Sequence, residues 1–356
     1  MSKTNSTGGA REAATLLFLY TETPLHVGSG SDVGAIDLPI MRERMTGLPT
    51  VPGSGLKGCL REVVTTRLGE EGKIKVNALF GPPPPSGKDT DEDQPSDYAG
   101  AASFTDARLL LFPVRSAYGG WAWLTCPLVL DRLRRDLAAT EVKVMPEVVF
   151  TTGSEDNKAM VDLNCVVTQG GWALLEDSPL QAETNNSVGG LARWLADRLP
   201  LGTGYDAYRK RLAGQLLVVS DTTFTRMARY HTEVATRVRI DSETHTVANG
   251  ALWTEESLPA ESLLWSVAHF TPGRQAQGYK RKDGSSEGGG AADKAAPKEA
   301  ALGFETAQAS LKTFKEVMGR DQDPDRVQRL RLGGDQSIGR GVVGLKIEGG
   351  NDATKN

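Results

Sequence analysis

The stretch Thr23–Arg61, TPLHVGSGSDVGAIDLPIMRERMTGLPTVPGSGLKGCLR, combines glycine loops, a lone aspartate between apolar residues and a group of basic side chains. Its glycines at 28, 30 and 34 allow positive φ angles and a close approach of the backbone to another group. Against the single Glu43, the following basic residues leave a local positive surplus: Arg42, Arg44, Lys57 and Arg61. The stretch therefore predicts a surface that binds phosphates.

The composition describes a soluble globular protein. The chain has 356 residues, of which 39% are hydrophobic, so it can form one elaborated domain or two. No apolar run approaches the roughly 20 residues of a membrane helix, and the N-terminus MSKTNSTGGARE is polar. We therefore expect a cytoplasmic protein without membrane contact. Cys59, Cys126 and Cys165 are far apart and odd in number, which argues against a disulfide framework and a zinc site.

The charges are segregated along the chain. A net charge of −4 argues mildly against nucleic-acid binding, but many acidic residues lie in one proline-rich tract at 82–100. That tract and the segment 273–302, rich in glycine, lysine, alanine and serine, are typical of disordered chain. A second group of basic residues lies near the C-terminus: Arg326, Arg329, Arg331 and Arg340. Two local basic patches can bind phosphates on a slightly acidic protein.

The order of predicted elements indicates an α+β domain built on an antiparallel sheet. A strand is expected at 14–20, and a helix at 55–68 that Ser54 caps and Gly69 ends. This helix places Lys57 and Arg61 on one face. The other predictions are strands at 101–113, 121–126 and 263–270, helices at 131–137, 191–199 and 306–318, a β-hairpin within 232–261, and a strand, glycine loop and strand from residue 330.

The glycine loops match no nucleotide-binding motif. The loop at 28–34 lacks the GxGxxG spacing, and the loop at 53–58 lacks GxxxxGK[ST]. The loop at 53–58 leads into a helix N-terminus with Lys57 in the first turn, which suits either a phosphate or an ordinary tight turn. A second glycine loop with a flanking arginine, at 333–341, favours phosphate binding over two ordinary turns. Arg237 and Arg239 share one face of the hairpin, where they meet a phosphate backbone or stay solvated.

Asp37 and His26 are the candidate catalytic residues. Asp37 lies between Ile36 and Leu38, so it is either a hydrogen-bonded loop anchor or a metal ligand or general base. His26 stands at the mouth of the same loop and either polarises a phosphate or fixes the loop. No Ser/His/Asp grouping supports a nucleophilic hydrolase.

Several motifs together resemble one known family. They are HVGSGSDVGAIDLPIMRERMTGLPTVPGSGLKGCLR from residue 26, ALFGPP from 78, LLFPVRS from 110, CPLVLDR from 126, TRVRI and GALWTEE within 236–256, and LGGDQSIGRG from 332. The chain resembles the multi-copy backbone subunits of Cmr complexes, which are RAMP (repeat-associated mysterious protein) superfamily members in type III-B CRISPR effectors. The resemblance spans most of the chain, with 82–100 and 273–302 as insertions.

The resemblance implies a ferredoxin-like, RRM-related palm with a β-hairpin thumb at about 232–262. It implies a single domain at 14–350, between a disordered N-terminus at 1–13 and a tail at 351–356. Copies of the subunit would polymerise as a helical filament along a CRISPR guide RNA, together with other Cmr-type subunits. Complementary target RNA would be cleaved at regular intervals beside nucleotides that the thumb displaces, for antiviral defence.

The resemblance also implies roles for individual residues. Asp37 matches the family's catalytic aspartate, which acts with a divalent metal ion (Mg²⁺ or Mn²⁺), and His26 matches a position beside it. Base pairing would provide the sequence specificity, while the protein would hold RNA backbones. The residues expected to bind RNA are Arg42, Arg44, Ser54, Lys57, Arg61, Arg237, Arg239, Gly333, Gly334 and Arg340.

Two other functions are compatible with the residues. One is a scaffold that binds guide RNA without cutting target RNA, which an Asp37→Ala variant would distinguish from a nuclease. The other is an α+β enzyme that uses the glycine loops for a cofactor. Such an enzyme would purify without RNA of defined length.

Overall fold

The structure is a computed structural model that describes residues 12–31, 34–82, 99–140, 145–147, 156–273, 304–319 and 328–348. The chain divides into two compact units. The smaller unit comprises Met1–Thr15, Leu60–Phe104 and Ala268–Gln322, and the larger comprises Leu16–Cys59, Thr105–Val267 and Asp323–Asn356. The tails and insertions expected at 1–13, 82–100, 273–302 and 351–356 lie almost wholly outside the described residues. The assignment of 14–350 to a single domain stays a prediction.

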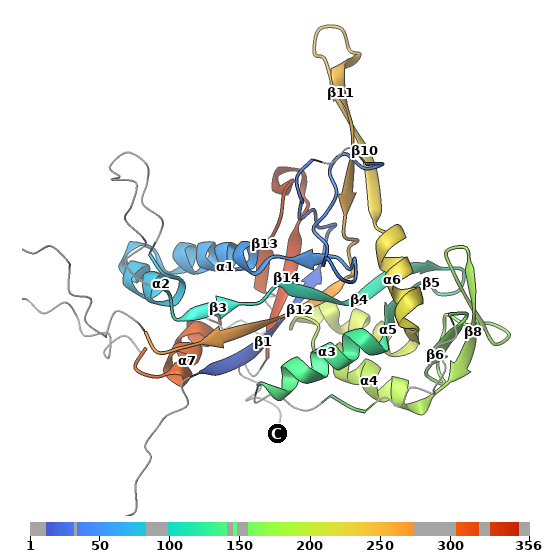
Figure 1. The fold of residues 1–356 in the computed structure, drawn as a ribbon, viewed down its shortest axis with the longest axis horizontal. Coiled ribbons are helices and arrows are strands. Elements are labelled where there is room, and N and C mark those ends of the chain that lie inside the picture. The colour runs from blue at the N-terminus through green and yellow to red at the C-terminus, as the bar shows by residue number, and fades with distance from the viewer. Residues whose placement is uncertain are drawn as a thin grey trace, which may run out of the picture. The chain divides into compact units, whose positions relative to one another are not determined.

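The fold is mixed α+β, as expected, and its main feature is a 12-stranded sheet (Figure 1). The main path along the sheet is β13 (Gln328–Arg331), β14 (Val342–Ile347), β1 (Ala13–Thr21), β12 (Leu263–Phe270), β4 (Ala107–Ser116), β5 (Gly120–Thr125), β9 (Leu216–Val219), β6 (Lys158–Val161), β8 (Ser178–Thr184) and β7 (Trp172–Leu175). Two short strands lie off this path: β2 (Thr50–Val51) pairs with β4, and β3 (Ala102–Phe104) pairs with β12. Pairing is mostly antiparallel, but β5 with β9 and β6 with β8 are parallel. β7 also pairs with β4, so this end of the sheet closes on itself.

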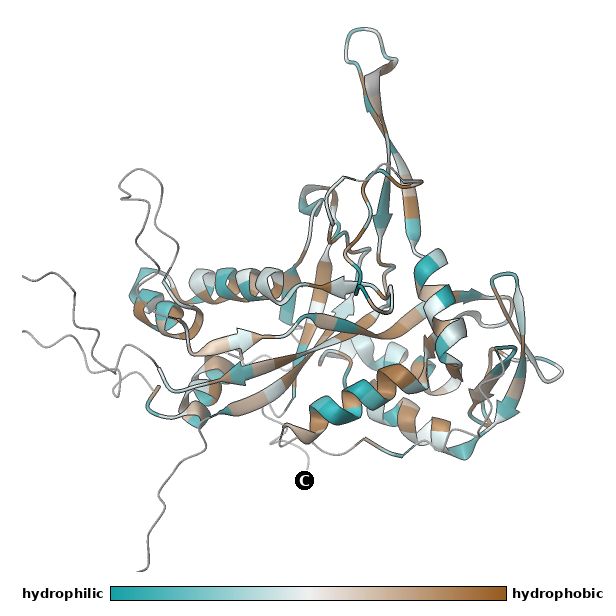
Figure 2. Ribbon diagram, in the orientation of Figure 1, coloured by the Kyte–Doolittle hydropathy of each residue, from teal (hydrophilic) through white to brown (hydrophobic). Residues whose placement is uncertain are grey.

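Strands β1, β4 and β12 form the centre of the core. Leu16, Leu17, Phe18 and Leu19 are all fully buried, because both faces of β1 are covered. Such a strand has a continuous apolar run instead of an alternating one. Figure 2 shows hydrophobic colour along these strands. The larger unit also holds α3 (Pro127–Ala138), α4 (Asn186–Ala196), α5 (Asp206–Gln215), α6 (Asp221–Tyr230) and the start of α1 (Gly53–Leu68).

The smaller unit has an aromatic core of its own. Its elements include α2 (Lys73–Phe80), β3 (Ala102–Phe104), which pairs with the end of β12, and α7 (Ala307–Met318). Phe104 packs against Phe80 and Phe314, and Phe314 also packs against Phe270. None of the helices in the described part of the chain is long and apolar enough to span a membrane.

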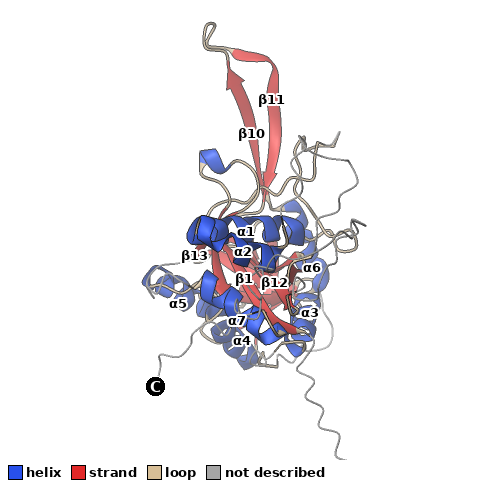
Figure 3. Cartoon of the chain, turned by 90° about the vertical axis from the view of Figure 1, so that its left-hand side faces the viewer, coloured by secondary structure: helices blue, strands red, loops and turns tan. Residues whose placement is uncertain are grey.

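A separate two-stranded ribbon lies within the residues expected to form the hairpin. Its strands are β10 (Glu233–Ile240) and β11 (Val247–Ser257), which pair with each other in antiparallel register and extend away from the main sheet (Figures 1 and 3). One face of the ribbon exposes apolar side chains, among them Val234, Val238 and Leu252. The surface of the ribbon is therefore partly apolar.

Four predicted elements need correction. The strand expected at 101–113 is two strands, β3 and β4, because the chain is interrupted at residues 105 and 106. The Thr105 hydroxyl accepts a hydrogen bond from the Val267 N–H (2.9 Å), and the Asp106 carboxylate accepts one from the Gly53 N–H (2.8 Å). Ser54 is not the cap of α1: the helix begins at Gly53, and the carboxylate of Asp106 is the acceptor at its N-terminus.

Two further helices begin earlier than expected. Helix α3 begins at Pro127, where the fixed φ of proline suits a first helical residue, and Asp221 accepts from the Leu128 N–H (2.9 Å). Helix α4 begins at Asn186 because the Asn185 side chain caps it, accepting from the Ser187 N–H at 3.0 Å.

Candidate active site

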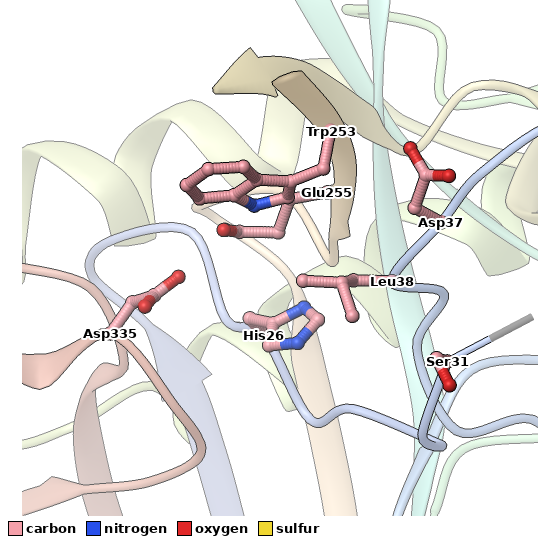
Figure 4. A pocket seen from close by; sticks show the side chains of 7 residues that line it. All are labelled: His26, Ser31, Asp37, Leu38, Trp253, Glu255 and Asp335. Carbon is pink, nitrogen blue, oxygen red and sulfur yellow. The ribbon is translucent and has the colours of Figure 1, made fainter. Parts of the chain in front are cut away.

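A cavity of about 370 Å³ in the larger unit brings together three distant segments of the chain (Figure 4). The loop after β1 contributes His26, Ser31, Asp37 and Leu38, strand β11 contributes Trp253 and Glu255, and the glycine loop between β13 and β14 contributes Asp335. The two residues expected to be catalytic, Asp37 and His26, thus line one cavity. This cavity lies where the hairpin strand β11 continues toward the main sheet.

The loop that carries Asp37 pairs with β11 through a single parallel bridge, between Leu38 and Glu255. The Leu38 N–H donates to the Thr254 carbonyl, and the Glu256 N–H donates to the Leu38 carbonyl, both at 3.0 Å. The Asp37 carboxylate is fixed by the same strand, since its Oδ2 accepts from the Thr254 N–H (2.7 Å) and from the Thr254 hydroxyl (2.8 Å). The Asp37 N–H donates back to that hydroxyl at 2.9 Å. Asp37 is therefore attached to the hairpin.

These hydrogen bonds keep Asp37 charged to a lower pH than an ordinary aspartate. Its carboxyl is exposed, and its pKa lies below the ordinary value of 3.8, mainly because the Thr254 N–H and then the Thr254 hydroxyl stabilise the charged form. Asp37 is consequently a carboxylate at neutral pH. A lowered pKa also makes it a weak proton acceptor, because an efficient general base has a pKa near the working pH.

His26 is held by one ring nitrogen, and its other ring nitrogen faces Gly28. Its Nδ1 lies 2.6 Å from the Glu256 carbonyl oxygen, which can only accept, so Nδ1 carries the proton. The Nε2 atom faces Gly28, where a Cβ would lie only 2.9 Å away. The neutral ring therefore has its proton-accepting nitrogen at Nε2.

The second glycine loop packs directly on the backbone of His26. The Gly334 N–H donates to the His26 carbonyl at 2.8 Å. Gly333 has φ +73°, and a Cβ there would lie 2.2 Å from the same carbonyl oxygen. Glycine is required at 333 by this close approach, independently of any phosphate. Phosphate binding by Gly333 and Gly334 stays a prediction.

Two buried glutamates on β11 organise the site, and the sequence analysis did not identify either. Glu256 accepts from the Ile40 N–H (3.0 Å), from the Thr232 hydroxyl (2.7 Å) and from the Arg42 guanidinium. Glu255 lies between Arg237 (3.6 Å) and Arg340 (3.7 Å). The only sequence signal was a pair of adjacent acidic residues in a strand that otherwise alternates.

Most of the chain matches known proteins of one family. A model of the RAMP superfamily matches residues 18–343. The chain belongs to the RAMP superfamily. This RAMP protein is 30% identical to the protein named CRISPR system Cmr endoribonuclease Cmr4 of Pyrococcus furiosus, over 94% of the chain and 96% of that relative. The resemblance in the sequence motifs is thereby confirmed.

Solved structures share the fold of this RAMP protein. A crystal structure of oligomeric Cmr4 from P. furiosus superimposes with a TM-score of 0.62 at 24% identity, covering 94% of this chain and 98% of the other. A type III-B Cmr-beta complex bound to cognate target RNA contains a chain that matches with a TM-score of 0.59 at 20% identity, covering 94% and 96%. At these identities the two likenesses establish the mixed α+β fold.

The residues of the RAMP protein expected to bind RNA fall into distinct environments. Arg42, Arg237 and Arg340 make ion pairs with Glu255 or Glu256, and Arg42 also donates to the carbonyls of Gly47 (2.8 Å) and Ala228 (3.1 Å). Within the larger unit, Arg44, Ser54 and Arg239 are exposed and Lys57 is half-buried. Arg61 belongs to the smaller unit and donates to the Gly81 carbonyl at 2.5 Å. RNA binding by these residues stays a prediction.

The described residues do not form a complete metal site by themselves. Among them, no group of three or more His, Cys, Asp or Glu side chains is arranged to hold an ion. In Figure 4, Trp253 and Glu255 extend from β11 on the side of Asp335, whereas Asp37 stands on the other side of the strand. Glu255 is also neutralised by two arginines. Asp37 alone is too few ligands for a protein-held divalent ion.

Proposed function

We propose that this RAMP protein is the endoribonuclease backbone subunit of a type III-B CRISPR effector, which cleaves target RNA complementary to a bound guide. The observation that carries the proposal is the joint placement of Asp37 and His26 at one cavity beside the hairpin strand. Its 30% identity to a relative named an endoribonuclease, over 94% of the chain, supports this reading of the cavity. The subunit would act in the cytoplasm in antiviral defence.

The finer architecture suits a subunit that polymerises on RNA. We assign the main sheet and its helices to a ferredoxin-like, RRM-related palm and the ribbon β10–β11 to the thumb. The exposed Val234, Val238 and Leu252 give the ribbon an apolar face that can separate stacked bases. Copies of the chain would follow the guide as a helical filament with other Cmr-type subunits, and each thumb would displace one nucleotide.

Contacts to RNA backbones would provide affinity without sequence preference. Arg44, Ser54 and Arg239 are exposed and Lys57 is half-buried on α1, so these side chains can meet RNA phosphates at the surface of the larger unit. The side chains of Arg42, Arg237 and Arg340 would support this surface from within. Binding of guide RNA should consequently weaken as salt is raised.

The chain's own groups suggest how cleavage proceeds. A displaced nucleotide aligns its 2′-OH with the adjacent phosphorus, the new 2′-O–P bond forms as the bond from phosphorus to the 5′-oxygen breaks, and that oxygen takes a proton from water. Nε2 of His26 is the better acceptor for the 2′-OH proton, because the pKa of Asp37 is lowered by Thr254. Asp37 would orient the reacting groups. The proposed Mg²⁺ or Mn²⁺ would take most of its ligands from RNA and water.

Target cleavage by the assembled effector tests the proposal. With Asp37→Asn we expect cleavage to fall by about 100-fold or more while target binding is retained, because a positioned charge acts mainly on the transition state. Asp131→Asn is the matched control, since Asp131 is an exposed aspartate on α3 that pairs with Arg134. Unchanged cleavage by Asp37→Asn would favour a guide-binding scaffold. Preparations free of RNA in every assembly state would favour a cofactor-binding enzyme.

A further inference from the structure

Among the described residues, Thr254 is the only one whose side chain makes hydrogen bonds with both the carboxylate and the backbone of Asp37. Its hydroxyl donates to Asp37 Oδ2 at 2.8 Å and accepts from the Asp37 N–H at 2.9 Å. Its own N–H donates to the same Oδ2 at 2.7 Å. All hydrogen bonds described for the carboxylate therefore reach Oδ2.

We infer that Thr254 is a positioning residue for target RNA cleavage, which fixes the rotamer of Asp37 through its hydroxyl and presents Oδ1 to the reacting RNA. The inference rests on the proposed function and adds a residue that acts through Asp37. A carboxylate on an exposed loop otherwise samples several rotamers. Two donors on one oxygen select a single orientation before substrate binds, which is how a supporting residue preorganises a site.

Thr254 also couples the carboxylate to the hairpin. It belongs to β11 and lies opposite Thr236 of β10 in the hairpin register. Because the Leu38 N–H also bonds the Thr254 carbonyl, the loop and the strand form one hydrogen-bonded unit around residues 37, 38 and 254. A shift of the hairpin that opened these bonds would release the carboxylate. The thumb that displaces a nucleotide would thus also hold the carboxylate that acts beside it.

Three substitutions distinguish the effect of the Thr254 hydroxyl from the effect of the side chain's shape. Thr254→Val removes the hydroxyl and keeps the β-branched form, and Thr254→Ser keeps the hydroxyl. Thr236→Val is the matched control, because it makes the same change at the directly opposite residue of β10, for which no hydrogen bond is described. All three are measured in the assembled effector at saturating target RNA.

We expect Thr254→Val to lower the single-turnover cleavage rate by roughly ten- to hundred-fold, the range for losing a hydrogen bond to a charged group. Target affinity should stay unchanged. Thr254→Ser should retain most of the rate, and Thr236→Val should cleave like the wild type. Loss of the hydroxyl should also raise the pKa of the Asp37 carboxyl toward its ordinary value of 3.8, which titration of this carboxyl in Thr254→Val measures.

Several results would overturn the inference. They are wild-type cleavage with an unchanged Asp37 pKa in Thr254→Val, an equal loss of rate in Thr254→Ser, or an equal loss of rate in Thr236→Val. Failure of the proposed function is distinguishable, because Asp37→Asn measured in parallel would then also cleave normally. An inactive Asp37→Asn beside a fully active Thr254→Val would reject the role of Thr254 alone.

Discussion

The contact between the second glycine loop and His26 makes a quantitative prediction for Gly333→Ala. Gly333 has φ +73°, and left-handed backbone costs a residue with a Cβ about 1–2 kcal/mol. The new Cβ would also lie 2.2 Å from the His26 carbonyl oxygen. The loop must therefore move and weaken the hydrogen bond from Gly334, which is worth about 0.5–1.5 kcal/mol. The expected loss of unfolding free energy is about 2–3 kcal/mol.

Gly339→Ala is the matched control for this prediction. Gly339 lies in the same loop with φ +88°, and a Cβ there would meet no atom within 4 Å. Gly339→Ala should lose only the unfolding free energy that left-handed backbone costs, about 1–2 kcal/mol. Urea unfolding of the full chain measures both variants, and an unchanged m-value would show that stability itself has changed. Equal destabilisation of the two variants would refute the close approach to His26.

Two further variants test other parts of the fold. Burial raises the pKa of Glu261 from 4.5 to about 7, so the folded state holds this proton more tightly. The stability that the protonated Glu261 contributes is present below pH 4.5 and is lost as the pH rises to about 7. Glu261→Gln should therefore flatten this part of the curve of unfolding free energy against pH. An unchanged slope in Glu261→Gln would contradict the burial of Glu261. Gly58→Ala should stabilise the chain by about 0.5–1 kcal/mol, because a Cβ inside α1 meets no atom within 4 Å. Destabilisation in a thermal melt would contradict the open space at that position.

Local patterns in the sequence predicted much of the fold. The apolar run at 14–20 became the buried strand β1, and the alternating residues within 232–261 became the ribbon β10–β11. These elements follow from periodicity, which neighbouring residues determine. The exact starts of α1 and α3 were missed where a distant residue accepts a hydrogen bond from the first turn, and the start of α4 was missed although its cap, Asn185, is adjacent in the chain. Asp106, for example, accepts from Gly53 across more than fifty positions of the chain.

The candidate site was predictable only in part for the same reason. Asp37 and His26 share a short glycine-rich stretch, so sequence proximity and the family resemblance both indicated them. Glu256 organises that stretch from more than two hundred residues away, and neither composition nor spacing connects them. Gly333 was interpreted as a phosphate contact, although its requirement for glycine arises from packing on His26.

The central claim is that the carboxylate held at the base of the hairpin supports cutting of target RNA. Mapping the ends of target fragments from the assembled effector, with wild-type and Asp37→Asn subunits, tests it most directly. The account predicts cuts at regular intervals that leave a 2′,3′-cyclic phosphate in the wild type, and their loss in Asp37→Asn with the target still bound. The same cuts at the same rate in Asp37→Asn would contradict it.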